Sequence, residues 1–312
     1  MDYSIALVGV GAIGGFLAAH LCEADAQVSI LARPRTRDAI RSGGLHVATG
    51  GQEISVHPSC VTSDAGEIGP VDLVLFAVKG QDTFAAAENM RPLVGPTTRI
   101  LTFQNGLFGA EMLAQMFDPA QVLAGVTYVP AIVDAPGRIR HTGAVKRFVF
   151  GPYVPEAAAP VAGAFEVLGR EAGLDMVMLD APMTEIWAKF VMLTPFHLVS
   201  CLTRGPLGNW ISVSETQQVY VDAMKEVVAV ATACGVTLPD GLVERNLAFS
   251  LETADPGTRA SMLDDLERGR PLELEATVGW LNATATRVGV EVPLHRLGYA
   301  MLKPLVGGTQ VA

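Results

Sequence analysis

The first 120 residues alternate between short, continuous apolar runs and stretches whose apolar residues recur at helical spacing. Continuous apolar runs predict strands buried on both faces, and the helical spacing predicts the crossovers between them. We expect helices that end at Leu21 and that cover Asp82–Leu93, and strands at Ser4–Val8, Val28–Leu31, Val71–Val78 and Ile100–Phe103. Strands that alternate with helices are typical of a parallel, doubly wound α/β sheet.

The pattern changes after Leu123 and again after residue 181. Shorter elements separated by glycine and proline come first, and we expect strands at Val122–Ile132, Gly137–His141 and Lys146–Gly151, a helix at Glu156–Ala172 and a strand at Met176–Leu179. Only helical patterns then remain, at Thr184–Cys201, Val213–Cys234, Leu242–Leu251 and Leu272–Val288. We therefore predict an α/β domain over residues 1–181 and an all-α domain over residues 182–312.

Composition narrows the class of protein. Half of the residues are hydrophobic and the formal net charge is −10, which argues against a general binder of nucleic acid or anionic membranes. Glycine, proline or charge interrupts the apolar segments before about 20 residues, so we expect no membrane span. The first residues lack the basic stretch of a signal peptide, and the four cysteines lack zinc-site spacing. We therefore expect a cytoplasmic protein without a metal site.

A glycine motif, Gly9-Val10-Gly11-Ala12-Ile13-Gly14, lies between the first strand and the first helix. In this context the first glycine permits a tight turn, the second lets a pyrophosphate approach the backbone, and the third lets helix and strand pack closely. The amides of Ala12 and Ile13 would then face the phosphates at the helix N-terminus. The N-terminal half is thus predicted to be a Rossmann-type domain that binds a dinucleotide.

Arg33 follows the second strand, at the position where sites for NAD usually carry an acidic residue. A guanidinium there suits the 2′-phosphate of NADP and would leave NAD with a weaker partner, so we expect NADPH as the cofactor. Arg35 and Arg37 stand close by. They either add to the phosphate site or belong to a solvated loop.

Five separated segments together resemble the ketopantoate reductase (2-dehydropantoate 2-reductase) family. The resemblance rests on their order and approximate spacing over nearly the whole chain, because no single short motif is specific. Besides the glycine motif with Arg33, the segments are Ala77-Val78-Lys79, Gln104-Asn105-Gly106, Trp187-Ala188-Lys189, and Ser261-Met262-Leu263-Asp264-Asp265 with Gly269-Arg270-Pro271-Leu272-Glu273.

This resemblance implies an NADP-dependent enzyme of pantothenate biosynthesis that reduces a small 2-oxo acid to a 2-hydroxy acid. It also implies roles for single residues. Lys189 matches the catalytic lysine, and Asn105 matches an asparagine near the nicotinamide and the substrate. Ser261 and Glu273 match substrate-binding residues, and Arg33 and Lys79 match basic residues around the adenosine phosphate.

Each of these residues also has a simpler reading. Lys189 lies in an apolar stretch, where burial would lower its pKa toward the working range of a general acid. Alternatively, it is a lysine at the edge of a helix that extends its ammonium group to solvent. Asn105 could be a turn residue and Lys79 an ordinary exposed lysine, although both follow strands whose ends face the ligand crevice of such sheets. Ser261 could cap a helix that starts at Met262, and Glu273 or Glu275 could lie on a solvated helix face.

One departure from the family concerns the substrate. Family members usually carry asparagines one and two helical turns after the catalytic lysine, where this chain has Leu193 and His197. Pro195 makes the register less secure, because it favours a kink. Leu193 favours a more apolar substrate than ketopantoate, and His197 is either a second proton donor that titrates near neutral pH or a core histidine.

The leading hypothesis is therefore NADPH-dependent reduction of ketopantoate or a related carbonyl compound. An imine reductase or opine-type dehydrogenase would show a similar helical half. A regulatory protein that binds NADP without turnover would explain the change at Leu193. Apolar helices such as Val213–Cys234 could pack within the chain or form a homodimer.

Overall fold

The computed structural model describes residues 3–154 and 160–308. The chain divides into two compact units, Met1–Pro182 and Met183–Ala312. Each unit has its own hydrophobic core. The two units are therefore described separately below.

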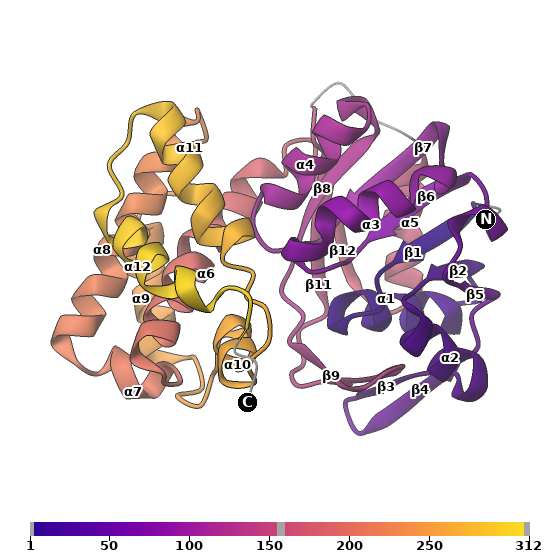
Figure 1. Cartoon of the computed structure of the whole chain (residues 1–312), viewed down its shortest axis with the longest axis horizontal. Helices are drawn as coiled ribbons and strands as arrows, with labels where there is room; N and C mark the ends of the chain where they lie inside the picture. The colour runs from indigo at the N-terminus through magenta and orange to yellow at the C-terminus, as the bar shows by residue number, and fades with distance from the viewer. Residues whose placement is uncertain (1–2, 155–159, 309–312) are drawn as a thin grey trace. The chain divides into compact units, whose positions relative to one another are not determined.

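The first unit is built on an eight-stranded sheet in the order β12-β11-β8-β7-β6-β1-β2-β5 (Figure 1). Neighbouring strands are parallel, except that β11 runs antiparallel to β8. The strands are β1 (Ile5–Val8), β2 (Val28–Leu31), β5 (Cys60–Thr62), β6 (Val71–Phe76), β7 (Val94–Thr102), β8 (Val122–Thr127), β11 (Arg147–Pro152) and β12 (Asp175–Met178). The predicted parallel α/β sheet is confirmed.

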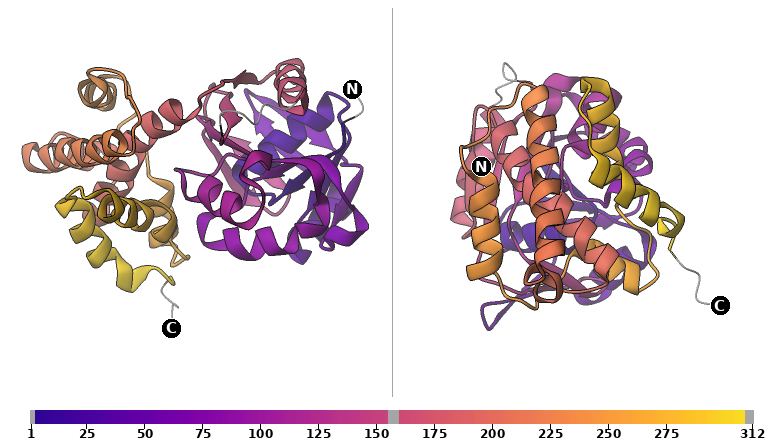
Figure 2. Two further views of the ribbon diagram at one scale, coloured as in Figure 1. Left: turned by 90° about the horizontal axis from the view of Figure 1, so that it is seen from above. Right: turned by 90° about the vertical axis from the view of Figure 1, so that its left-hand side faces the viewer.

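Helices cover both faces of this sheet because the chain winds outward from β1 in two directions. The crossover through α1 (Ala12–Glu23) leads to β2, whereas α3 (Thr83–Asn89) and α4 (Phe108–Met116) join β6, β7 and β8 on the other side of β1. Right-handed crossovers in opposite directions place their helices on opposite faces. Accordingly α3 packs beside α4, while α1 packs beside α5 (Pro160–Glu171), as Figure 2 allows the reader to follow.

A second sheet of four strands, ordered β4-β3-β10-β9, covers the other side of α1. Its strands are β3 (Leu45–Thr49), β4 (Gln52–Val56), β9 (Ala131–Ala135) and β10 (Arg138–His141). Packing is close there, since a Cβ on Gly15 of α1 would lie 2.0 Å from Cδ1 of Ile139. This sheet was not expected, nor were α2 (Pro34–Gly43) and β5, so Arg35 and Arg37 lie in a helix rather than in a loop.

The expected strand Val122–Ile132 is wrong as a single element. β8 ends at Thr127 in the large sheet, and β9 begins at Ala131 in the small one. Pro130 lies between them and cannot donate a backbone hydrogen bond to either ladder. The expected helix Asp82–Leu93 is likewise shorter, because single 3-10 turns at Gly80–Asp82 and Arg91–Leu93 flank α3.

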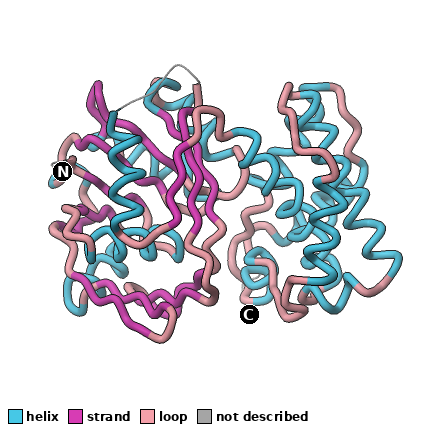
Figure 3. Tube along the Cα trace, turned by 180° about the vertical axis from the view of Figure 1, so that it is seen from behind, coloured by secondary structure: helices cyan, strands magenta, loops and turns pink. Residues whose placement is uncertain are grey.

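Within its described residues, 183–308, the second unit contains helices and no strand, as Figure 3 shows. Its helices are α6 (Met183–Thr203), α7 (Leu207–Ile211), α8 (Ser214–Ala233), α9 (Leu242–Glu252), α10 (Ser261–Glu267), α11 (Trp280–Val288) and α12 (Pro293–Leu302). The expected helix Leu272–Val288 instead begins with a π-helical turn, Glu275–Gly279. Of the expected helix Glu156–Ala172, residues 156–159 lie outside the described part of the chain.

Helix α6 is the centre of the second unit and packs against α7, α8, α9, α10 and α12. Its length and composition would suffice to cross a membrane, but 61% of the apolar window is buried inside the protein. We therefore interpret α6 as a core helix. Several apolar residues of α8 are also buried within the chain, among them Tyr220, Met224 and Val227.

Candidate functional site

The glycine turn after β1 contains two glycines that the fold itself requires. Gly9 has a φ of +95°, and a Cβ there would lie 2.7 Å from Cγ1 of Val78 and 2.9 Å from the carbonyl oxygen of Ala77. A Cβ on Gly14 would lie 2.2 Å from the carbonyl oxygen of Gly9. Both contacts are far shorter than van der Waals distance. Close packing of β1, β6 and α1 therefore excludes side chains at these two positions.

Gly11 differs from them, because the protein leaves room for a side chain there. Its φ of −83° is ordinary, and the nearest atom to a Cβ would be the carbonyl oxygen of Ala77 at 3.9 Å. Gly11 is the N-cap of α1, and the amide of Gly15 donates to its carbonyl at 2.9 Å. The amides of Ala12, Ile13 and Gly14 thus precede the first helical hydrogen bond and can donate to an anion. This surface fits the pyrophosphate of a dinucleotide.

Arg33 lies directly after β2 and is the N-cap of α2. Its side chain is exposed, and its Nη2 lies 2.7 Å from Oδ1 of Asp82, which follows β6. Asp82 was not predicted as a site residue from the sequence. Arg37 is engaged elsewhere: its Nε donates to Asp38 at 2.8 Å and its Nη1 to the hydroxyl of Ser63 at 3.3 Å. Of these arginines, Arg33 is the one whose ion pair joins the ends of two sheet strands.

Lys79 and Asn105 occupy the loops that follow β6 and β7, two neighbouring strands of the sheet. Lys79 is exposed and Asn105 is half-buried. Since parallel strands end at the same edge of a sheet, both residues belong to the edge that carries the glycine turn and Arg33. The structure thus brings the predicted cofactor residues of the first unit to one edge.

Gln104 connects these two loops and was not identified as a functional residue from the sequence. Its Nε2 donates to the carbonyl oxygen of Val78 at 3.0 Å and to Oγ1 of Thr83 at 2.8 Å. Its Oε1 accepts a hydrogen bond from Oγ1 of Thr102 at 3.1 Å. Gln104 therefore fixes the backbone immediately before Lys79 and before Asn105. Its position beside Asn105 in the Gln-Asn-Gly segment could have identified Gln104 from the sequence.

In the second unit, Lys189 lies on α6 between two buried aromatic residues. The ring centroids of Trp187 and Phe190 are 5.9 Å apart, and each packs on Trp280, at 5.6 and 5.7 Å. Lys189 itself is half-buried. Burial lowers the pKa of Lys189 to about 8, in the direction expected from the sequence. At neutral pH the side chain is charged but close to its pKa, as a proton donor requires.

His197 follows Lys189 by two helical turns and is 2% exposed. Burial, followed by the nearby charge of Lys189, lowers the pKa of His197 to about 4. The expectation that His197 titrates near neutral pH is therefore wrong, because desolvation disfavours the imidazolium. A neutral imidazole can still donate one hydrogen bond and accept another. Among the described residues, its Nδ1 is buried without a hydrogen-bond partner.

Ser261 is the first residue of α10, and Glu273 follows the turn after this helix. The segment shares a core with α6 around Leu198 and Cys201. Helix α10 starts at Ser261 with Ala260 as its N-cap, one residue earlier than expected, and no side-chain cap is formed. Ser261 is exposed and Glu273 is half-buried.

Two neighbouring carboxylates of this region have structural partners. Glu275 accepts hydrogen bonds from the hydroxyl of Tyr299 at 3.0 and 3.1 Å and pairs with Lys303. Asp265 is buried, and its Oδ1 lies 2.8 Å from Nε of Arg270. These contacts make Glu275 and Asp265 supporting residues of the second unit.

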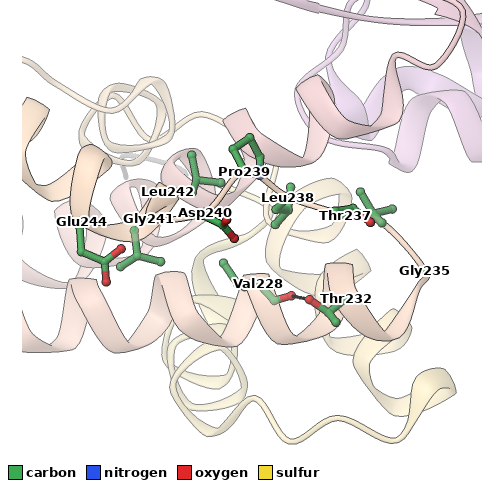
Figure 4. A pocket seen from close by; sticks show the side chains of 12 residues that line it. Val228, Thr232, Gly235, Thr237, Leu238, Pro239, Asp240, Gly241, Leu242 and Glu244 are labelled. Carbon is green, nitrogen blue, oxygen red and sulfur yellow. Dashed lines mark hydrogen bonds between the residues drawn. The ribbon is translucent and has the colours of Figure 1, made fainter.

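A cavity of about 500 Å³ lies elsewhere in the second unit, between the end of α8 and the start of α9 (Figure 4). It is lined by residues from Val228 to Glu244, and none of the predicted site residues is among them. Asp240 and Glu244 are its acidic residues. In the described part of the chain, no group of three or more His, Cys, Asp or Glu side chains could hold a metal ion.

Comparison with known proteins gives matches along nearly the whole chain. Residues 5–155 match the family model described as "Ketopantoate reductase PanE/ApbA", and residues 182–306 match the model of its C-terminal domain. The chain is 34% identical to a 2-dehydropantoate 2-reductase of Mesorhizobium japonicum, over 96% of this chain and 97% of that protein. It is 31% identical to one of Caulobacter vibrioides, over 96% and 98%. The crystal structure of 2-dehydropantoate 2-reductase from Geobacter metallireducens superposes with a TM-score of 0.89 at 30% identity, over 96% and 99% of the two chains.

Proposed function

Because the chain belongs to the ketopantoate reductase family, we propose that it reduces ketopantoate or a closely related 2-oxo acid to the 2-hydroxy acid with NADPH. The family makes the chain an oxidoreductase dependent on a pyridine nucleotide. The observation that carries the finer proposal is Lys189, an ammonium group on an apolar helix with its pKa lowered to about 8.

The first unit supplies groups suited to NADPH. The bare surface over Gly11 and the amides of Ala12 and Ile13 suit a pyrophosphate, and the cationic Arg33 and Lys79 suit a 2′-phosphate. The N-terminus of α2, which begins directly after Arg33, adds a partial positive charge. NADPH, when bound, supplies the hydride.

Lys189 then acts on the carbonyl oxygen of the substrate. That oxygen gains negative charge during reduction, and an ammonium donor in a water-poor site stabilises this charge and delivers the proton. Its lowered pKa makes Lys189 a stronger acid than an exposed lysine. Asn105 is proposed to orient the reacting groups from the loop after β7.

The remaining roles concern the substrate. We assign Ser261 to its carboxylate and Glu273 to a hydroxyl group such as that of ketopantoate, while His197 contributes a neutral imidazole. Leu193 lies one turn from Lys189 on the same face of α6. Its side chain offers no hydrogen bond, which favours a substrate that is apolar at the position it contacts.

The proposal is tested by measuring NADPH oxidation with 2-oxo acids of increasing size, ketopantoate included. We expect turnover with at least one 2-oxo acid alone. Turnover only when a ketone and an amine are both present would instead identify an imine reductase or opine-type dehydrogenase. NADPH binding without turnover on any carbonyl compound would identify a regulatory protein.

Two further expectations stay predictions. The chain is expected to be cytoplasmic. If it self-associates, we expect a homodimer. Sedimentation of the purified protein over a range of concentrations measures its assembly state.

A further inference from the structure

The ion pair between Arg33 and Asp82 bridges the two loops that border the glycine turn. Val8, the last residue of β1, is paired with Leu31 of β2 on one side and with Phe76 of β6 on the other. Arg33 follows β2 and Asp82 follows β6, and 2.7 Å separates their charged atoms. The pair thus joins the loops on either side of the turn that starts at Gly9.

We propose that Asp82 competes with the 2′-phosphate of NADPH for Arg33 and thereby limits the preference of the enzyme for NADPH over NADH. This inference rests on the proposed use of Arg33 as the phosphate ligand. Asp82 occupies Nη2 of that guanidinium. A phosphate that binds the same donors must displace the carboxylate. The ribose hydroxyls of NADH can bind without displacing it.

The exposure of the pair makes this exchange easy. The side chains of Arg33 and Asp82 are 77% and 36% exposed, so water can replace either partner and the pair opens at small cost. A phosphate carries more negative charge than a carboxylate and takes a bidentate guanidinium contact. The 2′-phosphate therefore wins the competition, but with reduced affinity.

Asp82 can be changed without loss of another contact to the fold. It precedes α3 as its N-cap, but its side chain makes no cap hydrogen bond. Asp82→Asn keeps the shape and removes the charge. We expect the Kd for NADPH to fall about two- to fivefold, the size of effect of one exposed charge pair. The Kd for NADH should not fall, so the ratio of the two should rise at least about twofold.

The experiment is calorimetric titration of the full chain with NADPH and with NADH. Glu88→Gln is the matched control, because Glu88 loses the same charge and pairs with Arg91 at 2.7 Å on the exposed side of α3. This control should leave both Kd values unchanged. In an Arg33→Ala background, Asp82→Asn should change the Kd for NADPH less than twofold, since no guanidinium remains to compete for.

The outcomes separate the two proposals. If the unaltered protein binds neither NADPH nor NADH, the proposed function fails. If it binds NADPH but Asp82→Asn leaves that Kd unchanged or raises it, Asp82 does not compete and the inference is overturned. Equal tightening of NADPH and NADH, or a full effect that persists without Arg33, also overturns it.

Discussion

The substitution Gly11→Ala separates an effect on the stability of the fold from an effect on cofactor binding. The added methyl group would meet its nearest protein atom, the carbonyl oxygen of Ala77, at 3.9 Å. That distance is ordinary van der Waals contact, and the φ of −83° suits alanine. The methyl group would instead cover the amides at the start of α1, where we propose that the pyrophosphate binds.

The expected effects on stability and binding differ strongly. Alanine is a poorer N-cap than glycine by roughly 0.5–1 kcal/mol, whereas restricting the unfolded chain stabilises by about 0.4–1 kcal/mol, so the two effects nearly cancel. A hydrogen bond from a backbone amide to a charged phosphate is worth about 1.5–3 kcal/mol. Losing one of them should cost roughly 1.5–3 kcal/mol, which weakens NADPH binding roughly 10- to 150-fold.

Urea unfolding and calorimetric titration with NADPH measure the two effects on the same preparations. Gly163→Ala in α5 is the matched control, because no protein atom lies within 4 Å of its added Cβ. It should leave the Kd for NADPH unchanged. Gly14→Ala should lower the free energy of unfolding itself, since its Cβ would lie 2.2 Å from the carbonyl oxygen of Gly9. An unchanged Kd for NADPH in Gly11→Ala would refute the assignment of the pyrophosphate to this turn.

The other predictions concern Lys189, Arg33 and His20. Lys189→Ala should lower kcat by roughly 10²-fold or more while NADPH still binds, as steady-state kinetics and titration can show. Because the acid form of Lys189 is required and its pKa is about 8, kcat for reduction should fall tenfold per pH unit above pH 8 in the unaltered enzyme. Arg33→Ala should weaken NADPH much more than NADH, and an equal loss for both would remove Arg33 from the 2′-phosphate site. Burial lowers the pKa of His20 from 6.5 to about 4. Between pH 6.5 and pH 4 the unfolded chain therefore binds more protons than the folded chain. On the order of 3 kcal/mol of stability should be lost as the pH falls through this range. Urea unfolding at pH 7 and pH 4.5 should show a smaller difference for His20→Asn than for the unaltered protein.

The elements that could be predicted are those whose burial is evident from the hydrophobic pattern of their own residues. β1 is a continuous apolar run, and β2 and β6 are apolar except for Ser29 and Asp72, because both faces of the sheet are covered. In contrast, α2 buries only Ile40 and β4 buries only Ile54, so their sequences carry almost no apolar period. Their place is set by packing against distant segments. The sequence therefore predicted the strands of the large sheet other than β5, but not the small sheet.

The same distinction applies to the candidate site. The glycine turn could be predicted because a short motif, a strand and a helix adjoin in the chain. The pairing of Arg33 with Asp82 depends on the order of β2, β1 and β6 in the sheet, which local patterns do not contain. The pKa of His197 depends on burial from all sides, so its residue type alone suggested the wrong value.

The three glycines of the turn show how structure adds to a motif. Gly9 and Gly14 have no room for a side chain, so the fold alone explains them. Gly11 has room and an ordinary φ, and glycine there costs conformational entropy that alanine would not. A residue type that the fold does not require must be explained by what the surface contacts. For Gly11, with unpaired helix amides beside it and cationic side chains at the same sheet edge, that contact is an anionic ligand lying against the backbone.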